Sequence, residues 1–363
     1  MFGGPGTKAT FACSFDPGVP EALAELECSI AISTYQAGKL IFISPNGKGG
    51  LVQLTRTFQK PMGFAISNDR LVLACEKEVL QFSNSRSLAQ HFPRRPGWYD
   101  ALYMPRATYH TGALDLHDVS IGGTGTIHAV NTAFNCIVQI TSDYSFIPIW
   151  KPPFTVQLQG DDQCHLNGMA MSDGVPRFAT AFGTGNKPKS WRDTIPGSGV
   201  LMDVQNDEIL LEGLGMPHSP RLFHGRLFLL LSATGQVLEV DVTDGSVQEI
   251  VRLDGFVRGM AIYRDHMFVG RSALRNASSS FERLNLKEAI PFAAISIIDL
   301  RSGRVVGNIS YQDSVEEIYD VQVLPGILRP NIMNTIGDEH RKGITTPDRT
   351  FWSSDPPEPK PRP

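Results

Sequence analysis

The amino-acid sequence predicts an all-β protein, and more specifically a six-bladed β-propeller. Three observations lead to this fold: the composition, a strand–turn–strand pattern that recurs along the chain, and a C-terminal strand with no partner after it. The chain of 363 residues is 41% hydrophobic and contains 34 glycines and 25 prolines. Such a mixture is typical of many short strands joined by turns.

The repeat begins with a small or polar residue, followed by an apolar run of period two, a turn and a second apolar run. Its six reference residues are Gly63, Asp118, Gly168, Ser219, Gly259 and Asp320. They are separated by 40 to 61 residues, which gives each unit room for about four strands. Period-two alternation indicates strands, and the intervening "SND", "SDG" and "HG" indicate hairpin turns.

Ring closure also has a sequence candidate. The N-terminal region offers three strands at 29–36, 38–45 and 51–58 but no inner strand before them, whereas the C-terminal "EEIYDVQVLPG" has no later partners. Pairing the two regions would complete one blade and remove exposed sheet edges. We therefore expect an N-terminal extension over 1–27, the propeller over 28–330 and a proline-rich tail over 331–363. Two unrelated α/β domains are the alternative, but no long helical pattern supports them.

Charge and targeting signals narrow the functional class. Charged residues make up 19% of the chain and the net charge is −4, with no basic stripe for nucleic acid and no basic amphipathic helix for a membrane. The first residues lack a signal-peptide pattern, and the five cysteines include no CxxC pair, which favours reduced thiols and a cytoplasmic location. The expected partner is a small-molecule substrate, and the oligomeric state stays open.

The inner strand of each propeller blade runs along the central channel, so residues that enter these strands converge on one mouth. One position before the reference residues stand Met62, His117, Asn167, His218, Arg258 and Tyr319. Three positions before them stand Lys60, Asp115, His165, Met216, Phe256 and Glu317. Three of the nine histidines therefore occupy matched positions in different blades.

Three imidazoles and a carboxylate predict a metal site at this mouth. Imidazole suits a divalent transition metal such as Zn, Fe, Mn or Cu, which lowers the pKa of bound water or polarises a substrate oxygen. The predicted ligands are His117, His165 and His218, with Glu317 as a fourth ligand or general base. The alternative is that each histidine merely caps the turn before its strand.

Further residues are predicted to contact substrate. Arg258 suits a carboxylate or phosphate, although an ion pair with Glu317 or Asp118 is an equal alternative. Asn167, Asp118 and Tyr319 would orient the substrate. A second group lies in "MPRATYHTGALDLHD", which we interpret as a loop overhanging the mouth. It contains Arg106 and Tyr109 as substrate contacts and His110 as a candidate acid or base.

Several motifs at once resemble a family of bacterial proteins. The chain contains "YMPRATYHTGALDLHD", "NTAFNCIVQI", "CHLNGMA", "MPHSPRL", "FVRGMA" and "VEEIYDVQVLPG". In these segments it resembles a conserved hypothetical family of unknown function with a predicted six-bladed propeller. The resemblance spans roughly residues 28–330. It implies the propeller fold and no activity.

A looser likeness is to the gluconolactonase and strictosidine-synthase group of propellers. Asn167 and Gly168 in "LNGMAMSDG" are similar to an Asn-Gly pair that helps hold a metal in that group. That group uses mainly carboxylate and amide oxygens, whereas this chain places histidines nearby, which favours a transition metal over calcium.

The sequence thus predicts a metal-dependent propeller enzyme for a small polar or anionic substrate, with lyase, hydrolase or oxygenase chemistry unresolved. The alternative is a non-enzymatic propeller that binds a protein or peptide through aromatic residues in long loops. Its candidate residues are Trp98, Tyr99, Tyr103 and Trp191. A third possibility is an accessory protein that is active only with a partner.

Overall fold

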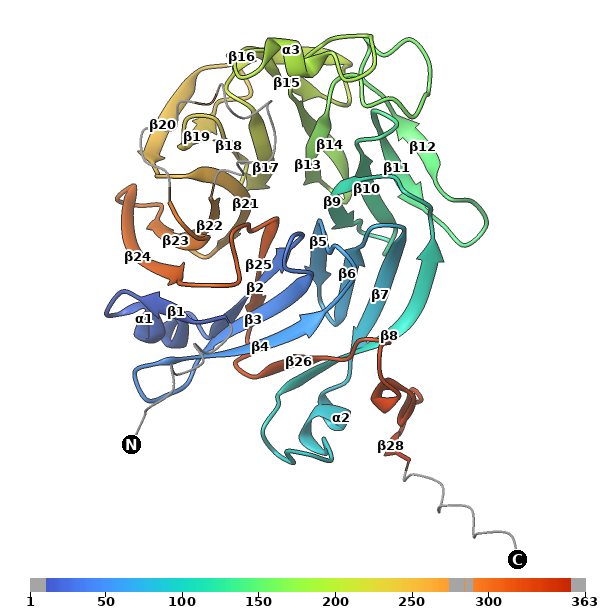
Figure 1. The fold of residues 1–363 in the computed structure, drawn as a ribbon, viewed down its shortest axis with the longest axis vertical. Coiled ribbons are helices and arrows are strands. Elements are labelled where there is room, and N and C mark those ends of the chain that lie inside the picture. The colour runs from blue at the N-terminus through green and yellow to red at the C-terminus, as the bar shows by residue number, and fades with distance from the viewer. Residues whose placement is uncertain (1–10, 274–283, 285–289, 354–363) are drawn as a thin grey trace, which may run out of the picture.

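The computed structural model describes residues 11–273, 284 and 290–353, and these form a ring of six sheets around a central axis, which we call the channel because the inner strands face it (Figure 1). This confirms the six-bladed β-propeller. Helices are short: α1 (Val19–Glu25), α2 (Arg86–Gln90) and α3 (Trp191–Thr194). No helix in these residues is long and apolar enough to cross a membrane. All five cysteines are free thiols, and four are buried.

Each blade is an antiparallel sheet whose innermost strand lines the channel. From the channel outwards, blade 1 contains β25 (Asp320–Pro325), β2 (Cys28–Thr34), β3 (Lys39–Pro45) and β4 (Leu51–Thr57). Blade 2 contains β5 (Phe64–Ser67), β6 (Arg70–Ala74), β7 (Glu78–Asn84) and β8 (Ala101–His110). Blade 3 contains β9 (Leu116–Ile121), β10 (Ile127–Asn131), β11 (Cys136–Ile140) and β12 (Ile147–Trp150).

The remaining three blades follow the same order. Blade 4 contains β13 (Leu166–Ser172), β14 (Val175–Ala181), β15 (Gly199–Asp203) and β16 (Glu208–Leu214). Blade 5 contains β17 (Pro217–Phe223), β18 (Arg226–Leu231), β19 (Gln236–Val240) and β20 (Val247–Arg252). Blade 6 contains β21 (Phe256–Tyr263), β22 (His266–Ser272), β23 (Ala294–Asp299) and β24 (Arg304–Tyr311).

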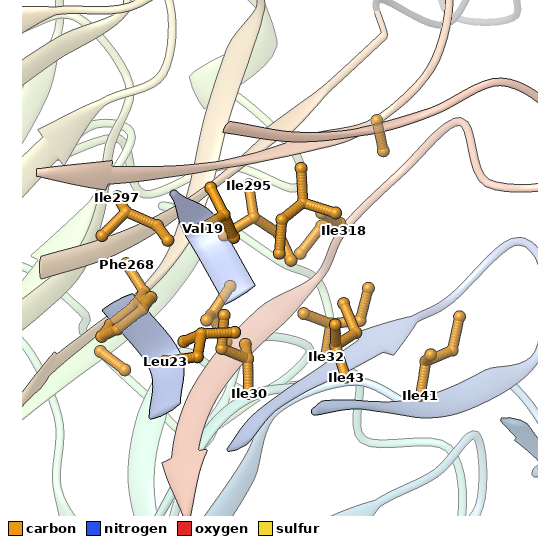
Figure 2. Close-up of a cluster of buried hydrophobic side chains, with 14 of the residues drawn as sticks. Val19, Leu23, Ile30, Ile32, Ile41, Ile43, Phe268, Ile295, Ile297 and Ile318 are labelled. Atoms are coloured by element: carbon orange, nitrogen blue, oxygen red, sulfur yellow. The ribbon is translucent and has the colours of Figure 1, made fainter. Parts of the chain in front are cut away.

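The ring closes in blade 1 as the sequence predicts. The C-terminal strand β25 pairs antiparallel with β2, in a register that runs from Asp320 opposite Ser33 to Pro325 opposite Cys28. A buried apolar cluster lies behind this joint, where Val19 and Leu23 of α1 pack with isoleucines of blades 1 and 6 (Figure 2). Removing these side chains from water stabilises the closed ring.

Both chain ends extend the propeller beyond the predicted limits. The strand β1 (Cys13–Phe15) pairs with β24, and β26 (Pro330–Ile332) runs parallel to β8. A short 3-10 helix (Glu339–Arg341) and a hairpin of β27 (Gly343–Thr345) and β28 (Thr350–Trp352) follow. The added strands cover the outer edges of blades 6 and 2, which would otherwise expose unpaired backbone groups. Residues 1–10 and 354–363 of the predicted extension and tail lie outside the described residues.

The same turn introduces the inner strand in four blades. The residues three positions before the reference residue have positive φ angles: Lys60 at 45°, Asp115 at 53°, His165 at 53° and Met216 at 58°. Positive φ is uncommon in residues other than glycine. Its recurrence at one offset confirms the register of the repeat.

The six reference residues alternate around the channel between glycine and a side-chain acceptor. A Cβ on Gly63 would lie 2.8 Å from the Asp118 Cα, and one on Gly259 would lie 2.8 Å from the Asp320 Cα. These glycines therefore let neighbouring inner strands approach closely. The acceptors then tie each strand to the next: Asp118 accepts from the Met169 N–H at 3.1 Å, Ser219 from Gly259 at 3.0 Å and Asp320 from Phe64 at 3.2 Å.

Candidate functional site

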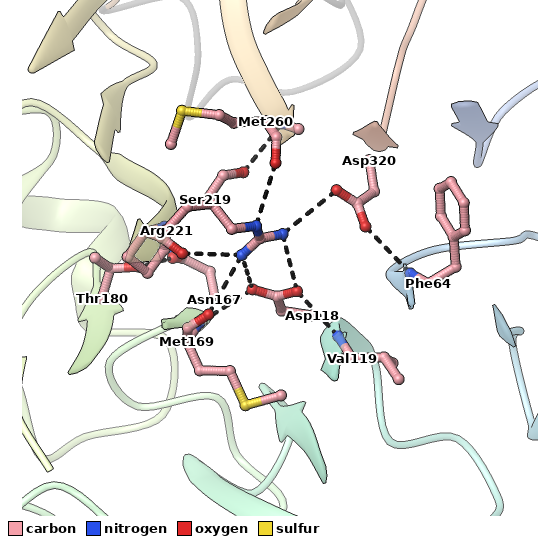
Figure 3. A network of polar contacts seen from close by, with 12 residues as sticks. Phe64, Asp118, Val119, Asn167, Met169, Thr180, Ser219, Arg221, Met260 and Asp320 are labelled. Atoms are coloured by element: carbon pink, nitrogen blue, oxygen red, sulfur yellow. Dashed lines mark hydrogen bonds and ion pairs between the residues drawn. The ribbon is translucent and has the colours of Figure 1, made fainter. Parts of the chain in front are cut away.

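The channel is closed at its centre by Arg221 of β17, which crosses it to reach Asp118 and Asp320 (Figure 3). The Arg221 Nη1 and Nη2 groups donate hydrogen bonds to the two Asp118 carboxylate oxygens, at 2.8 and 3.2 Å. Nη2 also lies 3.5 Å from Oδ1 of Asp320. Its Nε donates to the Met260 carbonyl at 3.2 Å. We call these three side chains, Arg221, Asp118 and Asp320, the central plug.

Asp118, which the sequence predicted as a substrate contact, belongs to the central plug. Both oxygens of Asp118 accept hydrogen bonds from Arg221, and they also accept from the backbone N–H groups of Val119 and Met169. Burial raises the pKa of Asp320 to about 6, while Arg221 opposes that rise. Asp118 therefore fixes the inner strands, and its carboxylate is already fully hydrogen-bonded.

Next to the plug, towards the start of the inner strands, side chains from three blades meet across the axis. The His117 and Tyr319 rings have centroids 5.5 Å apart, and the Arg258 guanidinium lies 3.4 Å from the Tyr319 ring centroid. Arg258 Nη1 is 3.7 Å from a Glu317 oxygen, so the predicted ion-pair alternative is observed. Stacking and pairing together hold the guanidinium at the mouth.

Besides the Tyr319 hydroxyl, two donors in this group have no hydrogen-bond partner in the part of the chain that the structure describes. They are Nη2 of Arg258 and Nδ2 of Asn167, and both atoms are buried. The Asn167 Oδ1, by contrast, accepts from the Thr180 hydroxyl at 2.7 Å. Buried polar groups normally find a partner, so these two donors indicate a place where a ligand atom belongs.

The three predicted histidines line the mouth together with aromatic residues. The His117 and His165 rings meet edge to face at 4.8 Å. Phe182 lies 4.6 Å from His165 and 5.0 Å from His218. Trp191 lies 4.4 Å from His165. Among the described residues, no three His, Cys, Asp or Glu side chains are arranged to hold a metal ion.

Hydrogen bonding fixes the tautomer of the two more deeply buried histidines. The Thr132 hydroxyl donates to the Leu166 carbonyl at 2.5 Å, so it accepts from His117 Nδ1, 2.8 Å away. In the same way the Ser232 hydroxyl donates to the Val257 carbonyl at 2.5 Å and accepts from His218 Nδ1 at 2.6 Å. A hydroxyl has one proton, so Nδ1 must carry the hydrogen in both rings.

The third ring follows the same rule with a different partner. His165 Nδ1 lies 3.1 Å from a carboxylate oxygen of Asp162, and this carboxylate also accepts from the Trp191 indole at 3.0 Å. Within the described chain, no Nε2 of the three rings has a hydrogen-bond partner. A ring that carries its hydrogen on Nδ1 presents an Nε2 lone pair that can accept a proton or a hydrogen bond.

Burial keeps two of the rings uncharged near neutral pH. It lowers the pKa of His117 to about 4, with a smaller contribution from the neighbouring Arg258. Burial followed by Arg258 lowers the pKa of His218 well below its usual value. Because desolvation disfavours the charged imidazolium, both rings act as acceptors and not as cations.

A pocket of about 400 Å³ adjoins the mouth and shares His165 and Trp191 with it. Its wall also carries Asp115, Asp161 and Asp162 together with Lys189 and Arg192. The volume and the mixed polar lining are in the range of small-molecule sites. The sequence prediction missed Asp162 and Phe182. It also missed Thr132 and Ser232, each of which directly follows the second strand of its blade, so aligning the repeats could have found them.

The second predicted group does not join the mouth. Arg106, Tyr109 and His110 lie on β8, so the prediction of a loop is wrong. The strand β8 lies outside β5, β6 and β7 of its blade, away from the channel. The His110 side chain is 84% exposed beside Glu78, and Arg106 donates to the Thr345 hydroxyl. These residues belong to the rim of blade 2.

The comparisons with known proteins agree with the fold. A family described as "Domain of unknown function (DUF4915)" matches residues 17–333. A crystal structure of a protein of unknown function from Bacteroides caccae is similar, with a TM-score of 0.52, 9% identity, and coverage of 82% of this chain and 98% of that one. A structure of a nidogen/laminin complex has a TM-score of 0.49 and 10% identity, covering 82% of this chain and 99% of that one.

No curated protein matches the chain in sequence. The resemblance to a propeller family of unknown function is confirmed. The looser likeness to the gluconolactonase and strictosidine-synthase group is not shown by these matches.

Proposed function

The chain belongs to the DUF4915 family of unknown function, and we propose that it is an enzyme whose axial mouth binds a small polar molecule carrying an anionic group. One observation carries the proposal. Three imidazoles from consecutive blades hold Nδ1–H on protein partners, and within the described chain their Nε2 atoms have no hydrogen-bond partner. The Nε2 lone pairs of such rings accept a proton or a hydrogen bond from a substrate hydroxyl or amine.

Arg258 is the proposed anchor for the anionic group. Its guanidinium is fixed between Tyr319 and Glu317, and its buried Nη2 has no partner in the described chain. A carboxylate or phosphate oxygen would complete that hydrogen bond, with the charge assistance that makes such bonds strong. Asn167 Nδ2 is a second unpartnered donor at the same mouth.

His165 is the proposed general base. Its Nδ1 faces the Asp162 carboxylate, and its ring opens onto the 400 Å³ pocket. When Nε2 takes a substrate proton, the carboxylate at Nδ1 stabilises the resulting imidazolium, which is the logic of an acid–histidine pair. His117 and His218 would accept hydrogen bonds beside it, because burial keeps both rings neutral.

A metal-dependent version of this enzyme is the second candidate. One divalent transition metal (Zn, Fe, Mn or Cu) would be held by Nε2 of His117, His165 and His218, with Glu317 as the fourth ligand, and it would activate water or polarise a substrate oxygen. Protein partners on Nδ1 are typical of metal-ligating histidines, and this pattern favours the version. The side chains would have to move to form the site, because no such group of three exists in the described residues.

A thermal-shift and calorimetric screen of small carboxylates and phosphates tests the first proposal. We expect at least one such anion to bind the wild-type protein, and Arg258→Gln to weaken it about tenfold or more, since hydrogen bonds to charged groups are worth about 1.5–3 kcal/mol. The matched control is Arg226→Gln, whose guanidinium pairs with Glu239 on the surface of blade 5. Anion binding that survives Arg258→Gln would contradict the proposal.

Metal analysis tests the second candidate. Protein purified from metal-replete culture should contain about one transition-metal ion per chain if that version is right. His165→Ala should lose the ion, whereas His340→Ala, near the C-terminus, should keep it. A wild-type protein without bound metal would exclude the metal version and leave the first proposal standing.

A further inference from the structure

A second pocket, of about 280 Å³, lies between blade 1 and the loop that follows α2. Its lining residues come from β3, β4, β26 and the segment after α2, and Figure 1 shows β4 and β26 beside each other. Phe42, Leu54 and Pro330 form apolar walls, while Arg95, Trp98 and Arg329 provide its polar and aromatic side. It shares no residue with the axial mouth.

Positive charge in this pocket has no acidic partner among the described residues. Its lining contains Arg95 and Arg329 but no Asp or Glu. The nearby Asp100 accepts from the backbone N–H groups of Leu328 and Arg329, at 2.6 and 2.9 Å, and not from the guanidinium. Arg329 Nη1 donates to the carbonyls of Pro45 and Leu328, at 2.5 Å each. Neither arginine has a carboxylate partner in the described chain.

Both cations lie beside one indole ring. The Arg95 and Arg329 guanidinium carbons lie 5.8 and 5.5 Å from the Trp98 ring centroid, and Trp98 is 45% exposed. The adjacent Tyr99 packs edge to face on Phe92 at 5.3 Å, and Phe92 packs on Trp352 at 5.6 Å. The C-terminal hairpin thus packs, through Trp352 and Phe92, against the loop that carries Trp98.

Four aromatic residues were expected to form the surface of a protein- or peptide-binding propeller, and the structure places them differently. Tyr103 is fully buried, and Trp191, with 4% exposure, contributes only to the wall of the 400 Å³ pocket. Trp98 and Tyr99 line the pocket instead of the mouth. A flat aromatic ring, apolar walls and two guanidinium groups that have no carboxylate partner in the described chain together suit a ligand with an aromatic body and an acid group.

We propose that this pocket is a binding site for a small aromatic carboxylate. The acid group contacts Arg95 and Arg329, and the ring lies against Trp98 and the apolar wall at Leu54. The volume is at the lower end of small-molecule pockets, so the ligand is a single-ring acid. The site is independent of the function proposed for the axial mouth.

Calorimetry with benzoate as the probe tests the assignment, with benzamide as its neutral analogue and inorganic phosphate as an anion without a ring. We expect saturable benzoate binding and at least about tenfold weaker binding of benzamide and of phosphate. Arg95→Gln should weaken benzoate to a similar extent, and Trp98→Leu should weaken it as well. Arg95 makes no side-chain hydrogen bond within the described chain, so its replacement removes no structural contact of that kind.

The matched control is Arg94→Gln, because the neighbouring Arg94 points to Glu339 outside the pocket and should leave benzoate affinity unchanged. Arg258→Gln should also leave it unchanged. Absence of benzoate binding, equal binding of benzamide or phosphate, or an equal loss in Arg94→Gln would overturn the proposal. A loss in Arg258→Gln alone would move the site to the axial mouth and overturn it too.

Discussion

The central plug and the mouth are built from the same inner strands, a few residues apart, yet their polar groups are satisfied differently. In the plug, every nitrogen of the Arg221 guanidinium meets an acceptor, and both plug carboxylates also accept backbone N–H groups. At the mouth, Arg258 Nη2 and Asn167 Nδ2 have no partner in the described chain. Complete pairing is what a structural network needs, whereas missing partners leave room for a ligand.

The largest effect should come from removing the cation of the plug. Arg221→Met leaves Asp118 and Asp320 buried without their counter-charge, so we expect a loss of about 3–5 kcal/mol in the free energy of unfolding. Chemical denaturation measures it. Arg226→Met is the matched control, and since its ion pair is partly exposed the loss there should be about 0–1 kcal/mol. Equal losses in the two variants would break the distinction between plug and surface pair.

A smaller effect is expected from acid, through His117. Its folded pKa of about 4 lies below the ordinary value of 6.5, so between these values the unfolded chain binds a proton that the folded chain does not. The stability contributed by this residue is therefore present above pH 6.5 and is lost as the pH falls towards 4. Asp320 has a raised pKa, so its contribution is instead lost as the pH rises through about 6.

Denaturation midpoints between about pH 4 and pH 7 separate the two contributions. His117→Gln should lose less stability on acidification than the wild-type protein, because the neutral amide takes up no proton. Asp320→Asn should change the pH dependence in the opposite sense. If His117→Gln and the wild-type protein fall in parallel, His117 is not the neutral buried group described above.

The smallest effect on stability is expected at His110, which was predicted at the mouth but lies on the rim of blade 2. His110→Ala should change the unfolding free energy by no more than about 0.5 kcal/mol, since the side chain is 84% exposed. It should also leave anion binding at the mouth unchanged. Loss of that binding, measured by calorimetry, would return His110 to the site and contradict its place on the rim.

The sequence predicts the ring because its reference positions repeat with a recognisable spacing, and it predicts the convergence of His117, His165 and Arg258 for the same reason. It did not reveal β8 as a strand, because Pro105 is unusual in one. In the structure the pairing register shifts between Gln81 and Phe82, opposite Pro105, and a strand tolerates proline at such an irregularity.

Arg221 was missed although the sequence carries a signal for it. It stands two residues after its reference residue, on the strand face that points into the channel. The same position in the other blades holds small or uncharged residues: Ala65, Ser120, Ala170, Ala261 and Gln322. One long cation among them has both the space and the charge to cross the channel. The tautomers could not be predicted, because they depend on hydroxyl partners brought in by folding.

The proposed function depends on three rings whose Nδ1–H groups are held by protein partners and whose Nε2 atoms have no partner among the described residues. Nitrogen-15 NMR of the imidazole rings, assigned with single His→Gln variants, measures this directly. Near neutral pH we expect Nδ1 to be protonated and Nε2 unprotonated in His117 and His218, with the Nε2 signals of the three mouth histidines shifting when the bound anion is added. Protonation at Nε2, or Nε2 chemical shifts that do not change when a ligand binds through Arg258, would contradict the proposed role of the histidines.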